Sequence, residues 1–187
     1  MRSIRRYYNG GVQDPVKNKK QITVEALDEI LYQKYGSADD KWGFDEFRDL
    51  TKNVEAGFVD SPYTKIQDDA PNNPLKVGRG AYQFDYESAK TAYQRLYNIA
   101  NPIGYTIPQL TDDDLKNVDK LSPEIQDMLF TAHFMNDKGS KVTDVLNDER
   151  TWAGNWADGH WKGEAKNRPA KIDMFNERYF QYYGPDQ

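Results

Sequence analysis

Apolar residues recur at helical spacing in two stretches of the first third of the chain. In residues 22–35 they follow one another every three or four positions, and Thr23 is a suitable capping residue. In residues 44–56 one face carries Phe44, Phe47 and Val54, acidic residues fill the first turn, and Gly57 follows. The pattern predicts two amphipathic helices.

Further helices are predicted downstream by the same spacing and by their start signals. One covers residues 86–99 after the capping residue Asp85, and a short one begins after Thr111. Ser122 followed by Pro123 predicts the start of a helix through about Met135, and the last helix begins near Pro169 and ends before Gly184. No clear alternating strand is present, so the expected fold class is mainly α, with at most a small β-ribbon in the loops.

Residues 57–78 form the longest stretch without periodicity. They are polar and contain three prolines. Loops of this length inside a compact domain tend to be functional or flexible. We therefore expect a long loop beside a site.

The composition indicates one globular domain with an aromatic core. Only 37% of the 187 residues are hydrophobic, but the chain contains 13 Tyr, 8 Phe and 4 Trp, which bury large areas per residue. A chain of this length can bury about 70% of its extended surface in a single core. We expect residues 21–187 to form one helical domain.

Residues 1–20 differ from this body in charge. They hold six basic residues and one acidic residue, whereas the whole chain has a net charge of -5. The stretch has turn signals and no apolar period, which predicts an extended basic arm. The arm either anchors the protein on an acidic partner surface or nucleic acid, or lies on its own acidic body.

Several classes of function are excluded by the residues that are missing. The sequence has no Cys and only two His, so it offers no disulfide framework, thiolate zinc site or cysteine nucleophile. No apolar run of 18 residues exists, and no apolar stretch follows the basic start, so neither a membrane span nor a secretion signal is expected. We expect no metal and no cofactor.

The most specific motif combines Glu55-Ala56-Gly57 with the later run Gly78-Arg79-Gly80-Ala81-Tyr82-Gln83-Phe84. The first part places a carboxylate at a helix C-terminus. The second is a glycine-rich turn just ahead of a helix, where glycines permit the close approach of a backbone or ligand. The two parts together are suited to line a cleft.

These motifs, with Ser88-Ala89-Lys90-Thr91-Ala92 after them, resemble the soluble lytic transglycosylases and goose-type lysozymes. The aromatic Tyr-Gln-Phe version looks most like the lysozyme-like proteins of bacteriophage virions, and residues 122–130 are similar to a helix behind the cleft of those proteins. The resemblance implies a lysozyme-like helical fold with Glu55 as the catalytic acid. The candidate substrate-binding residues are Gly80, Tyr82, Gln83, Phe84 and Trp161.

The activity implied by the resemblance is cleavage of the β-1,4 MurNAc-GlcNAc bond of peptidoglycan. The acid must stay protonated near neutral pH, which a helix C-terminus and apolar neighbours such as Phe58 and Tyr82 favour. Of the two outcomes, transglycosylation is expected over hydrolysis, because the nearby carboxylates Asp60, Asp68 and Asp69 sit in the polar loop with nothing to fix their separation from Glu55.

The setting implied by the resemblance is a phage particle that acts at the host cell wall. The expected partners are a peptidoglycan glycan strand and other virion proteins held by the basic arm, without a membrane partner; nucleic acid is not favoured. The alternatives are a structural virion protein that keeps the lysozyme-like fold without turnover, which Ala56 in place of the family's Ser favours, and an unrelated helical binding protein.

A tryptophan-rich segment, residues 152–161, holds three of the four Trp. Flat indoles stack on sugar faces, and Asp158 or His160 offers polar contacts to hydroxyls, so a glycan-binding wall is one interpretation. The other, which we favour, is a segment pinned to the core by its aromatic side chains. His133, between apolar neighbours, is interpreted as a structural residue.

Overall fold

The protein consists of eight α-helices in the part of the chain that the structure describes. The computed structural model describes residues 19–37, 40, 43–57, 59–67, 72–135, 139–158 and 165–184. The helices are α1 (Val24–Tyr35), α2 (Phe44–Ala56), α3 (Tyr86–Ala100), α4 (Asp112–Lys116), α5 (Pro123–Phe134), α6 (Gly139–Asn147), α7 (Trp152–Trp156) and α8 (Arg168–Tyr183). Short 3-10 turns join several of them, among them η1 (Pro62–Thr64) and η2 (Pro74–Lys76). The expectation of a mainly α fold is confirmed.

The predicted helix starts are confirmed by their caps. The side chain of Thr23 accepts a hydrogen bond from the Ala26 N–H, and that of Ser122 accepts one from the Ile125 N–H. Asp85 caps α3 in the same way, through the Ser88 N–H. These side chains satisfy backbone donors that a helix start leaves without an intrahelical partner.

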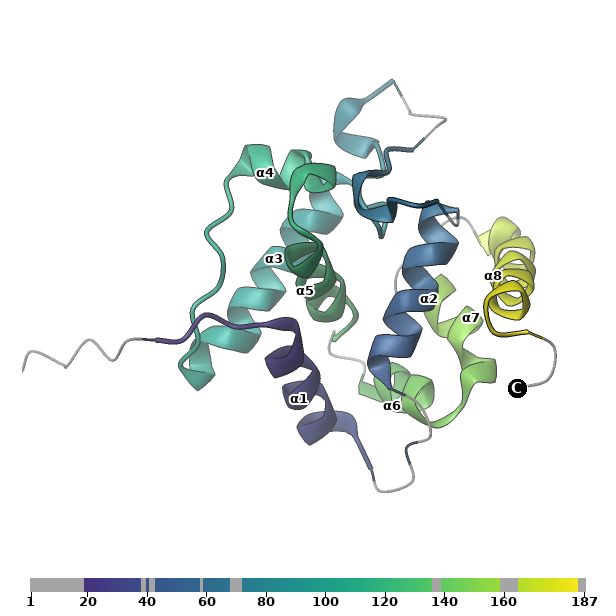
Figure 1. Cartoon of the computed structure of the whole chain (residues 1–187), viewed down its shortest axis with the longest axis horizontal. Coiled ribbons are helices and arrows are strands. Elements are labelled where there is room, and N and C mark those ends of the chain that lie inside the picture. Colours follow the sequence, from purple (N-terminus) through teal and green to yellow (C-terminus); the bar gives the residue numbers. More distant parts are fainter. Residues whose placement is uncertain are drawn as a thin grey trace, which may run out of the picture.

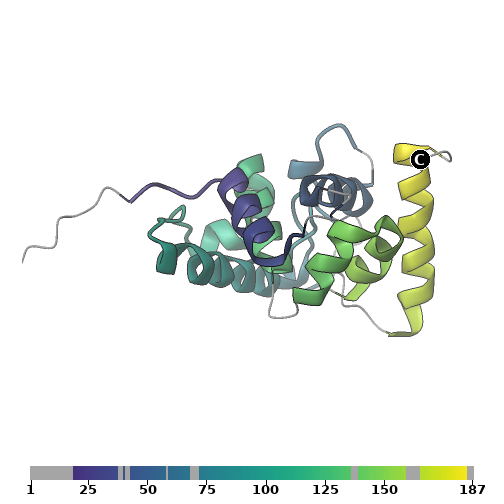
Figure 2. The same ribbon diagram turned by 90° about the horizontal axis from the view of Figure 1, so that it is seen from below.

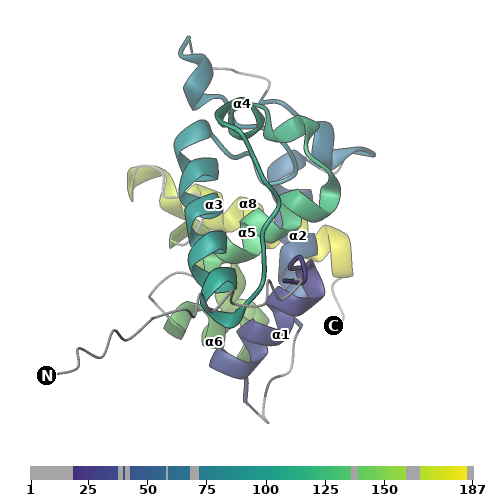
Figure 3. The ribbon, with the colours of Figure 1, turned by 90° about the vertical axis from the view of Figure 1, so that its left-hand side faces the viewer.

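The helices are arranged around α5. Helices α1 and α3 pack against α5 on one side, while α2 packs against α5, α6 and α8 (Figure 1). Helix α8 stands at one end of the molecule and packs on α7 and α2 (Figure 2). The segment after α3 runs back along that helix to reach α4 (Figure 3).

The core between these helices is rich in aromatic rings, as the composition predicts. Phe47 lies 5.0 Å from Phe134 and 5.6 Å from Trp152, measured between ring centroids. Phe130 stacks on Tyr82 at 4.3 Å. Rings from α2, α5 and α7 therefore meet in one cluster, which anchors the first turn of α2.

A partly buried ion pair also holds α2 in place. The guanidinium of Arg48 donates to both carboxylate oxygens of Asp28 on α1, at 2.7 and 3.0 Å, and to the Thr131 hydroxyl on α5 at 3.1 Å. A bidentate pair of this kind fixes orientation as well as distance. Helices α1, α2 and α5 are thereby joined seven residues before Glu55.

The predicted β-ribbon is not found as such in the described residues. Two isolated antiparallel bridges, Ile66 with Arg79 and Arg79 with Phe84, stand where the ribbon was expected. The long loop is present and carries η1 and η2.

Residues 1–18 of the predicted basic arm lie outside the described residues. Its last two residues are described, and Lys20 accepts a backbone hydrogen bond from Thr106 at 3.0 Å. In the described part of the chain, no helix is both long and apolar enough to cross a membrane.

Candidate active site

A polar cleft of about 360 Å³ lies where α2 ends and α3 begins. Its lining comes from five places in the sequence: the end of α2, the loop, the turn before α3, the start of α3 and the start of α8. The residues are Glu55, Gln67, Lys76, Gly78, Gln83, Phe84, Asp85, Ser88 and Lys171. The cleft thus brings Glu55 together with two residues that the sequence motif singles out: Gln83, which is partly exposed, and Phe84, which borders the cleft although it is only 1% exposed.

Glu55 occupies the last turn of α2. The helix ends because Gly57 takes a left-handed conformation, with φ of 78°, and its N–H bonds back to the Asn53 carbonyl. The half-buried Glu55 side chain accepts a 2.7 Å hydrogen bond on Oε1 from the indole N–H of Trp156 on α7. Arg178 of α8 donates to the Val54 carbonyl beside it. The carboxyl group is held in one orientation at the rim of the cleft.

The glycine turn, residues 78–84, forms the facing part of the cleft. Arg79 and Phe84 exchange two backbone hydrogen bonds of 3.0 Å, which close the turn. Gly80 and Gln83 both have positive φ, 73° and 50°, and Gln83 is the one such non-glycine among the described residues. Glycine adopts this conformation without strain, whereas at Gln83 it is strained, and strain of that kind occurs often at functional sites. The Gln83 amide donates to the Gly80 carbonyl at 2.8 Å, so it is oriented by the turn itself.

Gln126 of α5 supports this turn from behind. Its Oε1 accepts from the Ala81 N–H at 2.9 Å, and its Nε2 donates to the carbonyls of Tyr63 and Leu121. The side chain is completely buried. One amide therefore connects the loop, the turn and the segment before α5.

Tyr82 lies in the core and not at the cleft. It is 0% exposed, its ring stacks on Phe130, and its hydroxyl donates to Asp127 Oδ1 at 2.6 Å. Burial, followed by the charge of Asp127, raises the pKa of Tyr82 well above its ordinary value. This corrects the expectation that Tyr82 contacts substrate: its position supports the turn instead. Tyr63 also donates to Asp127, at 3.0 Å, and thereby fixes η1.

Replacing Tyr82 by Phe is expected to lower the free energy of unfolding by about 2 kcal/mol, because a buried hydrogen bond to a charged acceptor is lost. Urea unfolding measures this change. The half-exposed Tyr97 provides the matched control, since Tyr97→Phe is expected to change stability by less than about 0.5 kcal/mol. Equal effects of the two substitutions would contradict a role of Tyr82 in holding the turn.

The other predicted site residues have different positions. Gly80 is buried against Gln126 and does not line the cleft. Asp60 is exposed and lies outside the cleft lining. Trp161 lies outside the described residues, as do Phe58, Asp68, Asp69 and His160. Within the tryptophan-rich segment, Trp152 and Trp156 are buried, which confirms packing as the role of that part.

Asp85 is a cleft residue that the sequence interpretation assigned only to capping. Its Oδ1 accepts from the Ser88 N–H at 2.9 Å, and its Oδ2 lies 3.3 Å from Lys76 Nζ. Burial opposes ionisation of Asp85, but the hydrogen bonds from Ser88 and the charge of Lys76 outweigh it, so the pKa of Asp85 lies below its ordinary value. The sequence alone shows the capping signal. Only the folded structure shows that Asp85 lines the same cleft as Glu55.

The folded state lowers the pKa of Asp85, so the charged carboxylate stabilises the fold at pH values above the ordinary Asp pKa of 3.8. This contribution to stability is lost as the pH falls through the lowered pKa of the folded state. Asn is also a good capping residue, so Asp85→Asn removes the charge and retains the cap. We expect the wild type to be more stable than Asp85→Asn at neutral pH and the difference to vanish in strong acid. Thermal unfolding at a series of pH values measures it; a difference that stays constant into strong acid would contradict this assignment.

Comparison of the chain with protein-family models, curated proteins and solved structures finds no match.

Proposed function

We propose that this protein cleaves the β-1,4 MurNAc-GlcNAc bond of peptidoglycan with Glu55 as general acid. The observation that carries the proposal is the shared cleft: Glu55, oriented by Trp156, opens onto the same polar hollow as Gln83 and Phe84 of the glycine turn. Separate parts of the sequence motif thus meet in one place. The motif resemblance to lysozyme-like enzymes supports the choice of substrate.

In the proposed reaction the glycan strand lies in the cleft and Glu55 donates its proton to the glycosidic oxygen. The bond from C1 to that oxygen breaks, and the leaving sugar departs with a new hydroxyl group. The 6-hydroxyl of the remaining sugar then bonds to C1 and returns its proton to Glu55. The product is an anhydro sugar, and no water is consumed.

Transglycosylation is proposed over hydrolysis because of the state of Asp85. A hydrolase needs a second carboxylate as base or nucleophile, and Asp85 is the only other carboxylate among the described residues that line the cleft. Both of its oxygens already have partners, the Ser88 N–H and Lys76 Nζ, so the carboxylate is engaged in holding the start of α3 and not in holding a water or attacking C1. Asp85 is suited to hold the start of α3 and to favour positive charge at C1.

The test compares Asp85→Asn with Glu55→Gln in the release of soluble muropeptides from purified peptidoglycan. Asp85→Asn is expected to keep activity within about tenfold of the wild type, since no proton transfer depends on it, whereas Glu55→Gln falls by about 100-fold or more. Equal losses in the two variants, with both folded by circular dichroism, would contradict the one-acid mechanism and favour hydrolysis.

The proposed setting is a phage particle that delivers the enzyme to the host wall. The likeness of the motif to phage virion proteins and the basic charge of residues 1–20 support it. We expect removal of residues 1–18 to leave peptidoglycan digestion unchanged and to abolish incorporation into particles. Normal incorporation of the shortened chain, assayed on purified particles, would contradict the proposal that the basic arm attaches the protein to the particle.

A second candidate is a structural virion protein without turnover, and the Trp156 contact favours it. The hydrogen bond from the indole to Glu55 joins α7 to α2, so Glu55 has a structural use that does not require catalysis. A zymogram decides between the two candidates. Clearing by the wild type and none by Glu55→Gln supports the enzyme, whereas no clearing by the folded wild type supports the structural protein.

A further inference from the structure

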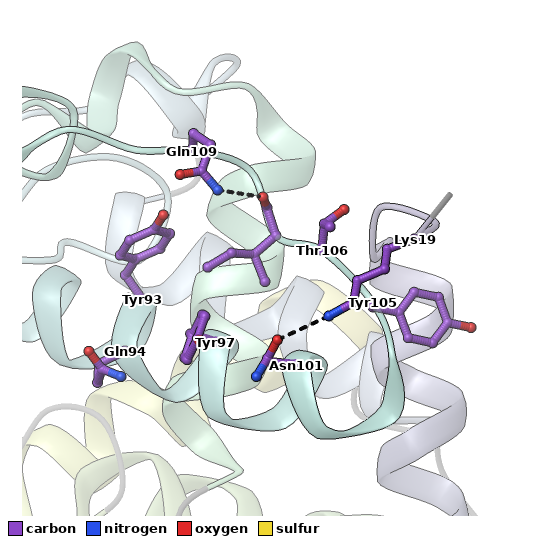
Figure 4. Close-up of a pocket in the computed structure, with 9 residues that line it drawn as sticks. Lys19, Tyr93, Gln94, Tyr97, Asn101, Tyr105, Thr106 and Gln109 are labelled. Carbon is purple, nitrogen blue, oxygen red and sulfur yellow. Dashed lines mark hydrogen bonds between the residues drawn. The ribbon is translucent and has the colours of Figure 1, made fainter. Parts of the chain in front are cut away.

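A second hollow, of about 310 Å³, lies at the other end of α3 from the cleft (Figure 4). Tyr93, Gln94 and Tyr97 lie on α3, Asn101 follows at its C-terminal end next to Lys19, and Gln109 lies on the segment that follows (Figure 4). The complete lining is Lys19, Tyr93, Gln94, Tyr97, Asn101, Tyr105, Thr106, Ile107 and Gln109. We name this site the α3 hollow.

The α3 hollow is separate from the candidate active site. Ser88 lines the cleft and Tyr97 lines the hollow, and the two residues are nine positions apart on one helix. Nine residues correspond to about two and a half turns, so the two side chains leave α3 on opposite sides and about 13 Å apart along its axis. A ligand in one site does not reach the other around the helix.

The chemistry of the lining is aromatic and uncharged, apart from one cation. Three tyrosines and three side-chain amides surround the space, and no carboxylate is present among the described lining residues. The one cation, Lys19, lies 3.4 Å from the Asn101 side-chain oxygen. Amide groups supply both donors and acceptors, and tyrosine rings supply flat apolar faces. This combination matches a neutral ligand with hydroxyl groups on one side and C–H groups on the other.

The hollow is also held in shape by the fold. The Tyr93 hydroxyl donates to the Pro108 carbonyl at 3.0 Å and accepts from the Leu110 N–H at 3.2 Å, which joins the two walls. Thr106 is fixed by backbone hydrogen bonds to Lys20 and Ile22. Against this fixed frame the Tyr97 side chain is 47% exposed, which is a large exposure for an aromatic ring inside a hollow.

We infer that the α3 hollow binds a neutral saccharide, with a pyranose ring stacked on Tyr97 and its hydroxyl or acetamido groups bonded to Asn101, Gln94 and Gln109. A cationic ligand is disfavoured because the lining offers a cation and no anion, and the tyrosines and amides that make up most of the lining suit an uncharged ligand. A preformed pocket with an aromatic face and a few convergent polar groups is the general form of a small-ligand site. The inference does not depend on cleavage at Glu55.

The experiment titrates the ¹⁵N-labelled Glu55→Gln protein with chitotriose and follows backbone amide shifts by NMR. We expect saturable shifts at residues 93–109, with Kd raised at least tenfold by Tyr97→Ala and also raised by Asn101→Ala. Tyr182→Ala is the matched control, because Tyr182 on α8 is 46% exposed and remote in sequence from the hollow. It should leave Kd unchanged.

Three outcomes would overturn the inference. Shifts confined to residues 76–88 would place the sugar in the cleft alone, which leaves the proposed function standing. Shifts at 93–109 that Tyr97→Ala does not weaken would remove the stacking contact. Binding of a short peptide there without binding of chitotriose would make the hollow a peptide site. Loss of cleavage by the wild type, measured separately, bears on Glu55 and not on this inference.

Discussion

Glu55→Gln is expected to reduce peptidoglycan cleavage by about 100- to 10,000-fold, which is the usual contribution of a general acid. The amide is nearly the same size as the carboxyl group and cannot donate the proton that the leaving oxygen requires. Its carbonyl oxygen still accepts the hydrogen bond from Trp156, so the join between α2 and α7 is retained. The loss should appear in turnover with little change in thermal stability.

The control for this substitution is Asp60→Asn, which changes an exposed carboxylate in the same loop region outside the cleft lining. It should leave cleavage within about twofold of the wild type, because exposed loop charges contribute little. A Glu55→Gln protein that digests peptidoglycan as fast as Asp60→Asn would contradict the assignment of Glu55 as the acid.

Gly80→Ala is expected to lower the free energy of unfolding by about 3 kcal/mol or more. Gly80 has φ of 73°, and a Cβ there would lie 2.2 Å from Gln126 Oε1. The left-handed backbone alone costs about 1–2 kcal/mol for a residue with a Cβ, and displacing the buried amide adds about 1–3 kcal/mol. Chemical denaturation provides the measurement.

Gly104 offers the matched control, since its φ is 87° and a Cβ there meets nothing within 4 Å. Gly104→Ala should therefore cost only the backbone part, about 1–2 kcal/mol. In a double-mutant cycle, Gly80→Ala combined with Gln126→Ala should lower the free energy of unfolding by less than the sum of the two single changes. The reason is that the new Cβ no longer meets the Gln126 amide. Equal costs at Gly80 and Gly104, or strict additivity in the cycle, would contradict the role of Gln126 behind the turn.

The elements that the sequence predicted well are those whose own residues carry the signal. Helices α1, α2, α3 and α5 have caps and apolar spacing that are visible without any partner, as at Thr23 and Ser122. Helices α6 and α7 were missed because they are short and rich in β-branched residues or interrupted by Gly154. They are held by tertiary packing, for example by the Trp152 indole on the Val145 carbonyl at 2.8 Å.

In the candidate site, too, the residues within a local motif were predicted, and those brought together by the fold were not. The sequence motif selected Glu55 and Gln83, and the fold brings them to one cleft. Tyr82 was expected to contact substrate, but only Gln83 and Phe84 beside it line the cleft, while its own ring turns inward onto Phe130. Asp85, Lys76 and Lys171 come together from three elements, and no local pattern predicts such a meeting.

The central claim is that the protein cleaves the glycan strand by transglycosylation with Glu55 as the acid. The most direct measurement is mass spectrometry of purified peptidoglycan digested by the wild type and by Glu55→Gln. The account predicts anhydro-muropeptides, lighter by one water than hydrolysed fragments, from the wild type and none above background from Glu55→Gln. Hydrolysed fragments with reducing ends from the wild type would contradict the mechanism, and no soluble fragments from the folded wild type would contradict the activity.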